Sequence, residues 1–78
     1  MDGPLYQGHY SNDVRHGKGL MIWDVRRRYR GDWAYGVRHG YGEAVEVDEN
    51  WNLVVKGAIW EQEKIKEIKF EKRIRLEE

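Results

Sequence analysis

The chain has 78 residues, of which 36% are charged and 40% apolar, and its formal net charge is zero. A chain of this length forms at most one domain with a thin core, which argues against a large enclosed active site. The balanced charge gives no overall attraction to nucleic acid, and the absence of cysteine excludes disulfides and thiolate metal sites.

Four Trp and five Tyr supply the large side chains that disordered chains lack, so we expect a folded, water-exposed domain. Residues 1–4 include an acidic residue and have no apolar run behind them, which does not indicate a secretory signal. No stretch approaches the roughly 20 apolar residues of a membrane span. We therefore expect a cytoplasmic protein or an intracellular part of a larger assembly.

The first predicted hairpin spans residues 6–23. In residues 6–10 two tyrosines and a glycine alternate with polar side chains, which indicates a strand with one packed face. Residues 11–13 are turn formers, and Asp13 stands at a position that favours positive φ. The returning strand, at 17–23, carries two glycines on one face, which predicts that bulky rings lie on the backbone there.

The same pattern returns 23 residues downstream without a gap. Residues 29–33 repeat the first strand, and the run Val-Arg-His-Gly at 37–40 repeats residues 14–17. The second hairpin is predicted to have strands at 29–33 and 40–47, after a connector at 24–28. The chain is therefore organised as a row of hairpins.

A third unit is weaker. Residues 55–59 follow residues 29–33 at a spacing of 26, and Gly57 is kept while the aromatic residues become aliphatic. This loss is typical of a terminal repeat on which no further copy stacks. The tail, residues 61–78, is rich in helix formers. Its apolar positions nevertheless alternate with one parity, broken only by Lys72, which favours a strand and leaves a helix as the alternative; these positions are Ile68, Phe70, Ile74 and Leu76.

These residues resemble MORN repeats, whose pattern is an aromatic, Gly, an aromatic, then a Gly turn and His-Gly-x-Gly. Two tandem copies match well, apart from Asp13 in place of the first turn glycine. The residues that carry the resemblance are Tyr6, Gly8, Tyr10, His16, Gly17 and Gly19 in the first copy, Tyr29, Gly31, Trp33, Gly36, His39, Gly40 and Gly42 in the second, and Gly57 in the third.

The resemblance implies an all-β fold in which tandem antiparallel hairpins form an elongated, twisted, single-layer sheet with a C-terminal strand as a cap. We expect one domain over residues 1–78, with repeat 1 at about 6–28, repeat 2 at about 29–54, and a degenerate repeat 3 with the cap at about 55–78. In such a sheet the aromatic rings lie over glycines of neighbouring strands.

The resemblance also implies a function. MORN-repeat proteins mostly act as non-catalytic modules that scaffold cytoskeletal and ciliary assemblies or dock partner helices, and some have been linked to acidic phospholipids. We therefore expect an adaptor that binds a helix or strand along its sheet, or a second copy of itself. The regular tail is also compatible with a designed sequence without a biological function.

The repeat aromatics and glycines are interpreted as structural, although an aromatic strip on an open sheet could also form a binding groove. The better interface candidates are the aromatic residues outside the repeat's packing positions. They are Trp23, Tyr35, Tyr41, Trp51 and Trp60.

The one local concentration of charge lies in and beside the first connector. Clustered arginines suit an anion such as an acidic phospholipid head group, and the residues are Arg26, Arg27, Arg28 and Arg30. The plainer interpretation is a solvated loop paired with Asp24 or Asp32. The zero net charge and the lack of a reader motif argue against nucleic acid.

Catalytic and metal sites are not expected, and no cofactor is implied. Ser11 is the only serine, threonine and cysteine are absent, and no phosphate-binding glycine loop occurs. Glu43 and Glu46 have opposite parity on their strand, so they point to opposite faces. His16 and His39 precede equivalent glycines and are interpreted as making a hydrogen bond across their hairpins, and His9 as solvated.

Overall fold

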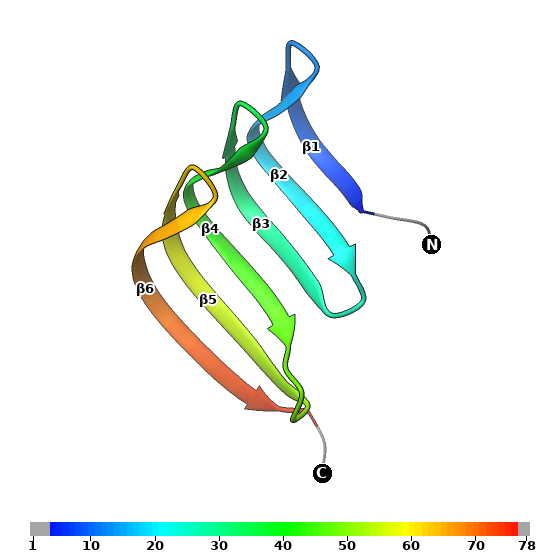
Figure 1. Ribbon diagram of the computed structural model, residues 1–78, viewed down its shortest axis with the longest axis vertical. Coiled ribbons are helices and arrows are strands. Elements are labelled where there is room, and N and C mark those ends of the chain that lie inside the picture. Colours follow the sequence, from blue (N-terminus) through cyan, green and yellow to red (C-terminus); the bar gives the residue numbers. More distant parts are fainter. Residues whose placement is uncertain (1–3, 77–78) are drawn as a thin grey trace.

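The structure is a computed structural model that describes residues 4–76. They form six antiparallel strands in one open sheet, ordered as in the sequence (Figure 1). The prediction of hairpins in a single layer is confirmed, and the tail is a strand, so the helix alternative is wrong. The strands are β1 (Leu5–Ser11), β2 (Val14–Asp24), β3 (Arg27–Ala34), β4 (Val37–Val47), β5 (Asn52–Glu61) and β6 (Lys64–Arg75).

The sheet is elongated and thin, with principal extents of 46, 32 and 15 Å. Successive hairpins lie side by side, and the three tight turns form a row along one end of the sheet (Figure 1). Within residues 4–76 no helix is long and apolar enough to cross a membrane.

The three tight turns share one geometry. Both central residues have positive φ in each: 52° and 68° at Asn12–Asp13, 54° and 88° at Tyr35–Gly36, and 54° and 73° at Gln62–Glu63. Two positive φ values are the signature of the type I′ turn, whose twist matches that of the flanking strands. The positive φ predicted for Asp13 is therefore present.

The connectors at the other end of the sheet are held by aspartates. Asp24 Oδ1 accepts the Arg26 amide at 2.8 Å, and Asp48 Oδ1 accepts the amides of Asn52 at 3.0 Å and Asn50 at 2.9 Å. These hydrogen bonds stabilise the ionised carboxyls, so the pKa values of Asp24 and Asp48 lie below the usual value.

The His-Gly step of each repeat makes a bulge. Gly17 and Gly40 have φ values of 98° and 99°, and the register of β1 against β2 shifts between Gly8 and Tyr10. A side chain is strained at such φ values, so this position favours glycine.

One face of the sheet, here named the aromatic face, holds the core. The ring of Tyr29 is fully buried and packs edge-on against Trp33 at 5.3 Å and Trp60 at 5.4 Å between ring centroids. The Tyr29 hydroxyl donates to the Asp32 carbonyl at 3.0 Å and contacts the position where a Cβ of Gly42 would lie. Burial raises the pKa of the Tyr29 phenol well above its usual value. The core is Met21, Tyr29, Trp33, Ala58 and Trp60, with Tyr6, Trp23 and Ala44 packed against it.

The third unit differs from the sequence alignment by one residue. Trp60 pairs with Gly40, as Trp33 pairs with Gly17. Trp60 thus takes the place of Trp33, and the spacing is 27 residues rather than the predicted 26. Gly57, on which the predicted spacing of 26 was based, is instead directed to the face opposite the aromatic face.

The tail also differs from its predicted parity. The register of β5 against β6 shifts between Gly57 and Ala58, so Ile68 pairs with Ala58 on the aromatic face while Phe70 pairs with Gly57. The prediction that Ile68 and Phe70 share a face is therefore wrong, because a bulge between them reverses the alternation.

Candidate interaction site

Two of the predicted aromatic anchors belong to the aromatic face. Trp60 is only 6% exposed, and its Nε1 donates to the Gly42 carbonyl at 3.3 Å. The prediction that Trp60 lies outside the packing positions is wrong, because the one-residue shift puts it in the core. Trp23 is half-buried against the same core.

The other three aromatic candidates lie apart from one another. Tyr35 is 81% exposed in the second tight turn, Trp51 is 51% exposed in the connector at the other end, and Tyr41 is 39% exposed on the opposite face. The five aromatic candidates therefore do not form one continuous patch.

The arginine cluster is also divided. Arg27 pairs with Asp24 at 3.3 Å, and the guanidinium carbon of Arg26 lies 5.2 Å from the ring centroid of Trp51. Arg28 and Arg30 project from β3 on the opposite face, where they line a common hollow. The four guanidiniums therefore do not converge on one anion, and Asp32 pairs with Lys18 rather than with an arginine.

The histidines do not behave alike. His16 Nδ1 accepts the Tyr35 amide at 3.3 Å, so it bonds to the turn of the next hairpin rather than across its own. The side chain of His39 is exposed and makes no hydrogen bond within residues 4–76, so the shared role predicted for the two is wrong. In the same residues no group of three or more His, Cys, Asp or Glu could hold a metal ion.

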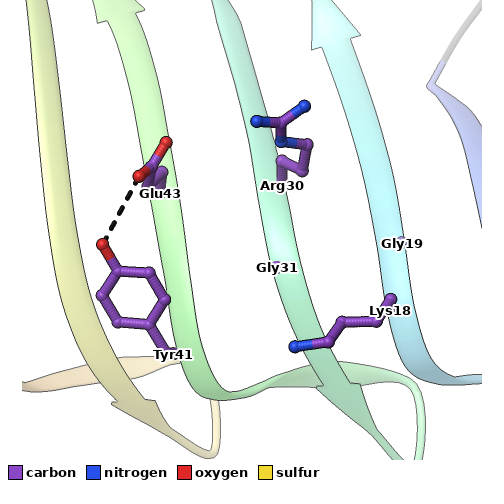
Figure 2. Close-up of a pocket in the computed structure, with 6 residues that line it drawn as sticks. All are labelled: Lys18, Gly19, Arg30, Gly31, Tyr41 and Glu43. Atoms are coloured by element: carbon purple, nitrogen blue, oxygen red, sulfur yellow. Dashed lines mark hydrogen bonds between the residues drawn. The ribbon is translucent and has the colours of Figure 1, made fainter.

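The opposite face carries a groove formed by two adjoining hollows of about 340 and 240 Å³, which share Arg30 and Glu43. Figure 2 shows the first hollow, with Arg30 and Glu43 on neighbouring strands and the Tyr41 ring at the side. Its lining residues are Lys18, Gly19, Arg30, Gly31, Tyr41 and Glu43, and Leu20, Arg28 and Val45 complete the second. We name this feature the opposite-face groove.

The opposite-face groove has a cationic centre. Neither Arg28 nor Arg30 makes an ion pair in the part of the chain that the structure describes. The Glu43 carboxylate lies across from Arg30 in the register but accepts the Tyr41 hydroxyl at 3.4 Å (Figure 2). Partial desolvation and this carboxylate raise the pKa of Tyr41. The groove thus presents two guanidiniums without an ion-pair partner next to apolar side chains, which are Leu20 and Val45, and next to the Tyr41 ring.

Comparison with known proteins agrees with this repeat geometry. The MORN repeat profile matches residues 6–24 and 29–44, which are the first two hairpins. The chain belongs to the MORN-repeat family. It is similar to MORN repeat-containing protein 3 of Xenopus laevis, with 36% identity over 67 residues that cover 82% of this chain. The chain spans 28% of that protein's length. No solved structure matches it.

The MORN units share an arginine that the sequence analysis did not single out. The guanidinium carbon of Arg38 lies 4.2 Å from the ring centroid of Trp60, and its Nε donates to Glu63 at 2.7 Å. At the equivalent position of the first unit, Arg15 lies 4.9 Å from the Trp33 ring centroid. The repeated run Val-Arg-His-Gly carried the signal, since its arginine recurs at the same spacing as its glycine.

The main-chain carbonyls of these two arginines also bind the tight turn of the next hairpin. The Gly36 amide donates to the Arg15 carbonyl at 2.9 Å, and the Glu63 amide donates to the Arg38 carbonyl at 3.1 Å. The second and third tight turns are therefore each tied to the hairpin before them by the same main-chain bond.

Proposed function

We propose that this chain is a non-catalytic MORN-repeat adaptor that binds a partner polypeptide, as a helix or a strand, along its open sheet. The observation that carries the proposal is the opposite face, where half-buried apolar side chains flank the opposite-face groove without a second layer over them. Three of these side chains, Ile22, Val45 and Val55, form a row across β2, β4 and β5 with Arg28 between them.

The physical argument is that a sheet normally buries both apolar faces against another layer. Covering apolar surface stabilises a complex by about 25 cal/mol per Å² before the costs of association are subtracted. The unpaired Arg28 and Arg30 favour a partner that brings an acidic residue within an apolar stripe. An amphipathic segment with one or two carboxylates fits this description, and it matches the family's role as a binding and scaffolding module.

The test begins with a photo-crosslinking residue at position 55 of this protein, expressed in cells of the organism that encodes it. The crosslinked polypeptide is identified, purified and titrated against the chain by calorimetry. We expect Val55→Lys to weaken binding at least tenfold, whereas the matched control Val25→Lys, in a turn where that residue is 90% exposed, leaves affinity unchanged. Equal affinities for the two variants would contradict the proposal.

A second candidate function is binding to acidic phospholipid, favoured by the unpaired Arg28 and Arg30 on one exposed face. Sedimentation with phosphoinositide vesicles tests it. Retention that Arg28→Ala with Arg30→Ala abolishes, and that Arg73→Ala leaves intact, would support the lipid function. Absence of retention would leave the protein partner as the function.

Self-association is tested separately, because β1 and β6 each have one unpaired edge. Solution mass at micromolar concentration distinguishes a monomer from a dimer. A dimer that Val55→Lys dissociates would make the partner of the opposite face a second copy of this chain, whereas a dimer that this variant leaves intact would be one that pairs through the free strand edges.

A further inference from the structure

The second and third units show how this fold binds a carboxylate. Glu63 occupies the second position of its turn, and its carboxylate accepts both Arg38 Nε at 2.7 Å and the Arg38 amide at 3.2 Å. The side chains of Arg38 and Glu63 are 20% and 38% exposed, so the pair is partly shielded from water. A charge-assisted pair of bonds of this kind is stronger than a neutral hydrogen bond.

The turn position that corresponds to Glu63 beside the first unit carries no carboxylate. Arg15 is equivalent to Arg38, but the turn residue that faces it is Gly36, which has no side chain. Arg15 Nη2 donates to the Gly36 carbonyl at 2.7 Å, whereas Arg15 Nε is buried and has no hydrogen-bond partner within residues 4–76. A buried donor without a partner is destabilising, because its lost hydrogen bond to water is not replaced.

Space for an acceptor lies next to this arginine. A hollow of about 190 Å³ adjoins Arg15, and a Cβ placed on Gly36 would meet only Val14, at 4.0 Å. Tyr10 and Asp13 complete the lining. The Asp13 carboxylate makes no ion pair within the described residues, and its charge opposes an incoming anion.

We propose that this hollow is a binding site for a carboxylate group, which Arg15 holds as Arg38 holds Glu63. Because Nε is enclosed in the unliganded structure, binding turns the guanidinium away from the Gly36 carbonyl and toward the ligand. The carboxylate comes either from an acidic side chain of a polypeptide or from a small free acid. The site lies at the row of tight turns and does not depend on the opposite-face groove.

The test follows the Arg15 Nε–H resonance by NMR in the 78-residue chain near pH 6.5, with Arg15→Lys used for assignment. The probes are acetate, the capped peptide Gly-Glu-Gly, and its neutral counterpart Gly-Gln-Gly. We expect acetate and the Glu peptide to shift this resonance downfield in a saturable manner, while Gly-Gln-Gly does not. Tighter binding of the peptide identifies a polypeptide source, and equal affinities identify a small acid.

Matched variants complete the test. Gly36→Glu supplies the carboxylate within the chain, so its Arg15 Nε–H should already resemble that of Arg38 and should no longer respond to acetate. Gly36→Gln carries the same backbone strain and should retain the response. Asp13→Asn should increase the affinity for acetate. A shift of Arg15 no larger than that of the exposed Arg75, or an unchanged response in Gly36→Glu, would overturn the proposal.

Discussion

The guanidinium carbon of Arg38 lies 4.2 Å from the ring centroid of Trp60. A charged side chain of the second hairpin thus covers a buried core ring of the third. The same guanidinium lies 5.1 Å from the Trp23 ring and 5.5 Å from the Tyr29 ring. Glu63 then binds its Nε. Arg38 thus closes the exposed side of a single-layer core.

The first prediction concerns this arginine. Arg38→Ala should lower the free energy of unfolding by about 1–3 kcal/mol, from lost cation–π contacts and a partly exposed ion pair. Arg75→Ala, at an exposed position on the edge strand, should change it by less than about 0.5 kcal/mol. Urea denaturation measures both. Similar costs for the two variants would show that Arg38 is not part of the core.

The second prediction compares two equivalent glycines. Gly42→Ala would place a methyl group against the fully buried Tyr29 ring, and Gly19→Ala would place one against Tyr6, which is half-buried next to the edge of the sheet. Overpacking of this kind costs about 1–3 kcal/mol when the neighbour cannot move. We expect Gly42→Ala to be the more destabilising in thermal unfolding. A larger destabilisation by Gly19→Ala would mean that the Tyr29 ring can move to accommodate the methyl group.

The third prediction concerns the last tight turn, where Gln62 has a φ of 54°. Left-handed φ costs most residues about 1–2 kcal/mol, and asparagine tolerates it better. Gln62→Asn should therefore raise the melting temperature, while Asn12→Gln, the reverse change in the first turn, should lower it. Both variants leave Glu63 in place, so the ion pair between Glu63 and Arg38 is unchanged. A lower melting temperature for Gln62→Asn, or a higher one for Asn12→Gln, would refute the turn assignment.

The fourth prediction is alkaline destabilisation. Burial raises the pKa of Tyr29 in the folded chain above the value of about 10 expected when unfolded. The unfolded chain therefore loses this proton first. The contribution of Tyr29 to the free energy of unfolding is constant below about pH 10 and falls above it, by up to about 1.4 kcal/mol per pH unit. Urea unfolding between pH 8 and 11.5 measures the fall. Tyr29→Phe should flatten it, and an unchanged slope would contradict the assignment.

Much of the fold could be predicted because the repeat is local. The alternation in residues 6–10 and its copy in 29–33 specify strand faces, and the glycines of His-Gly-x-Gly reflect two physical needs, positive φ at Gly40 and room for a ring at Gly42. Both needs act within one hairpin or its neighbour. The type I′ turns are also local, because they depend only on the two central residues of each turn.

The candidate site was less predictable because its elements depend on register. A single inserted residue moved Trp60 into the core, and a bulge in β6 turned Ile68 to the aromatic face. The arginines at 26–30 are adjacent in sequence, but a strand sends alternate side chains to opposite faces. Arg38 was missed because its role depends on Glu63, which belongs to the next unit and has no counterpart at Gly36.

The ordering of the strands has a consequence for how the chain folds. Each strand packs mainly against the strands next to it in sequence, and the second and third tight turns are tied to the preceding hairpin. Short loop closures of this kind favour rapid folding, and nearest-neighbour coupling lets any hairpin nucleate and the order spread outward. The two outermost hairpins, which each have one neighbouring hairpin instead of two, should exchange their amide hydrogens before the central one.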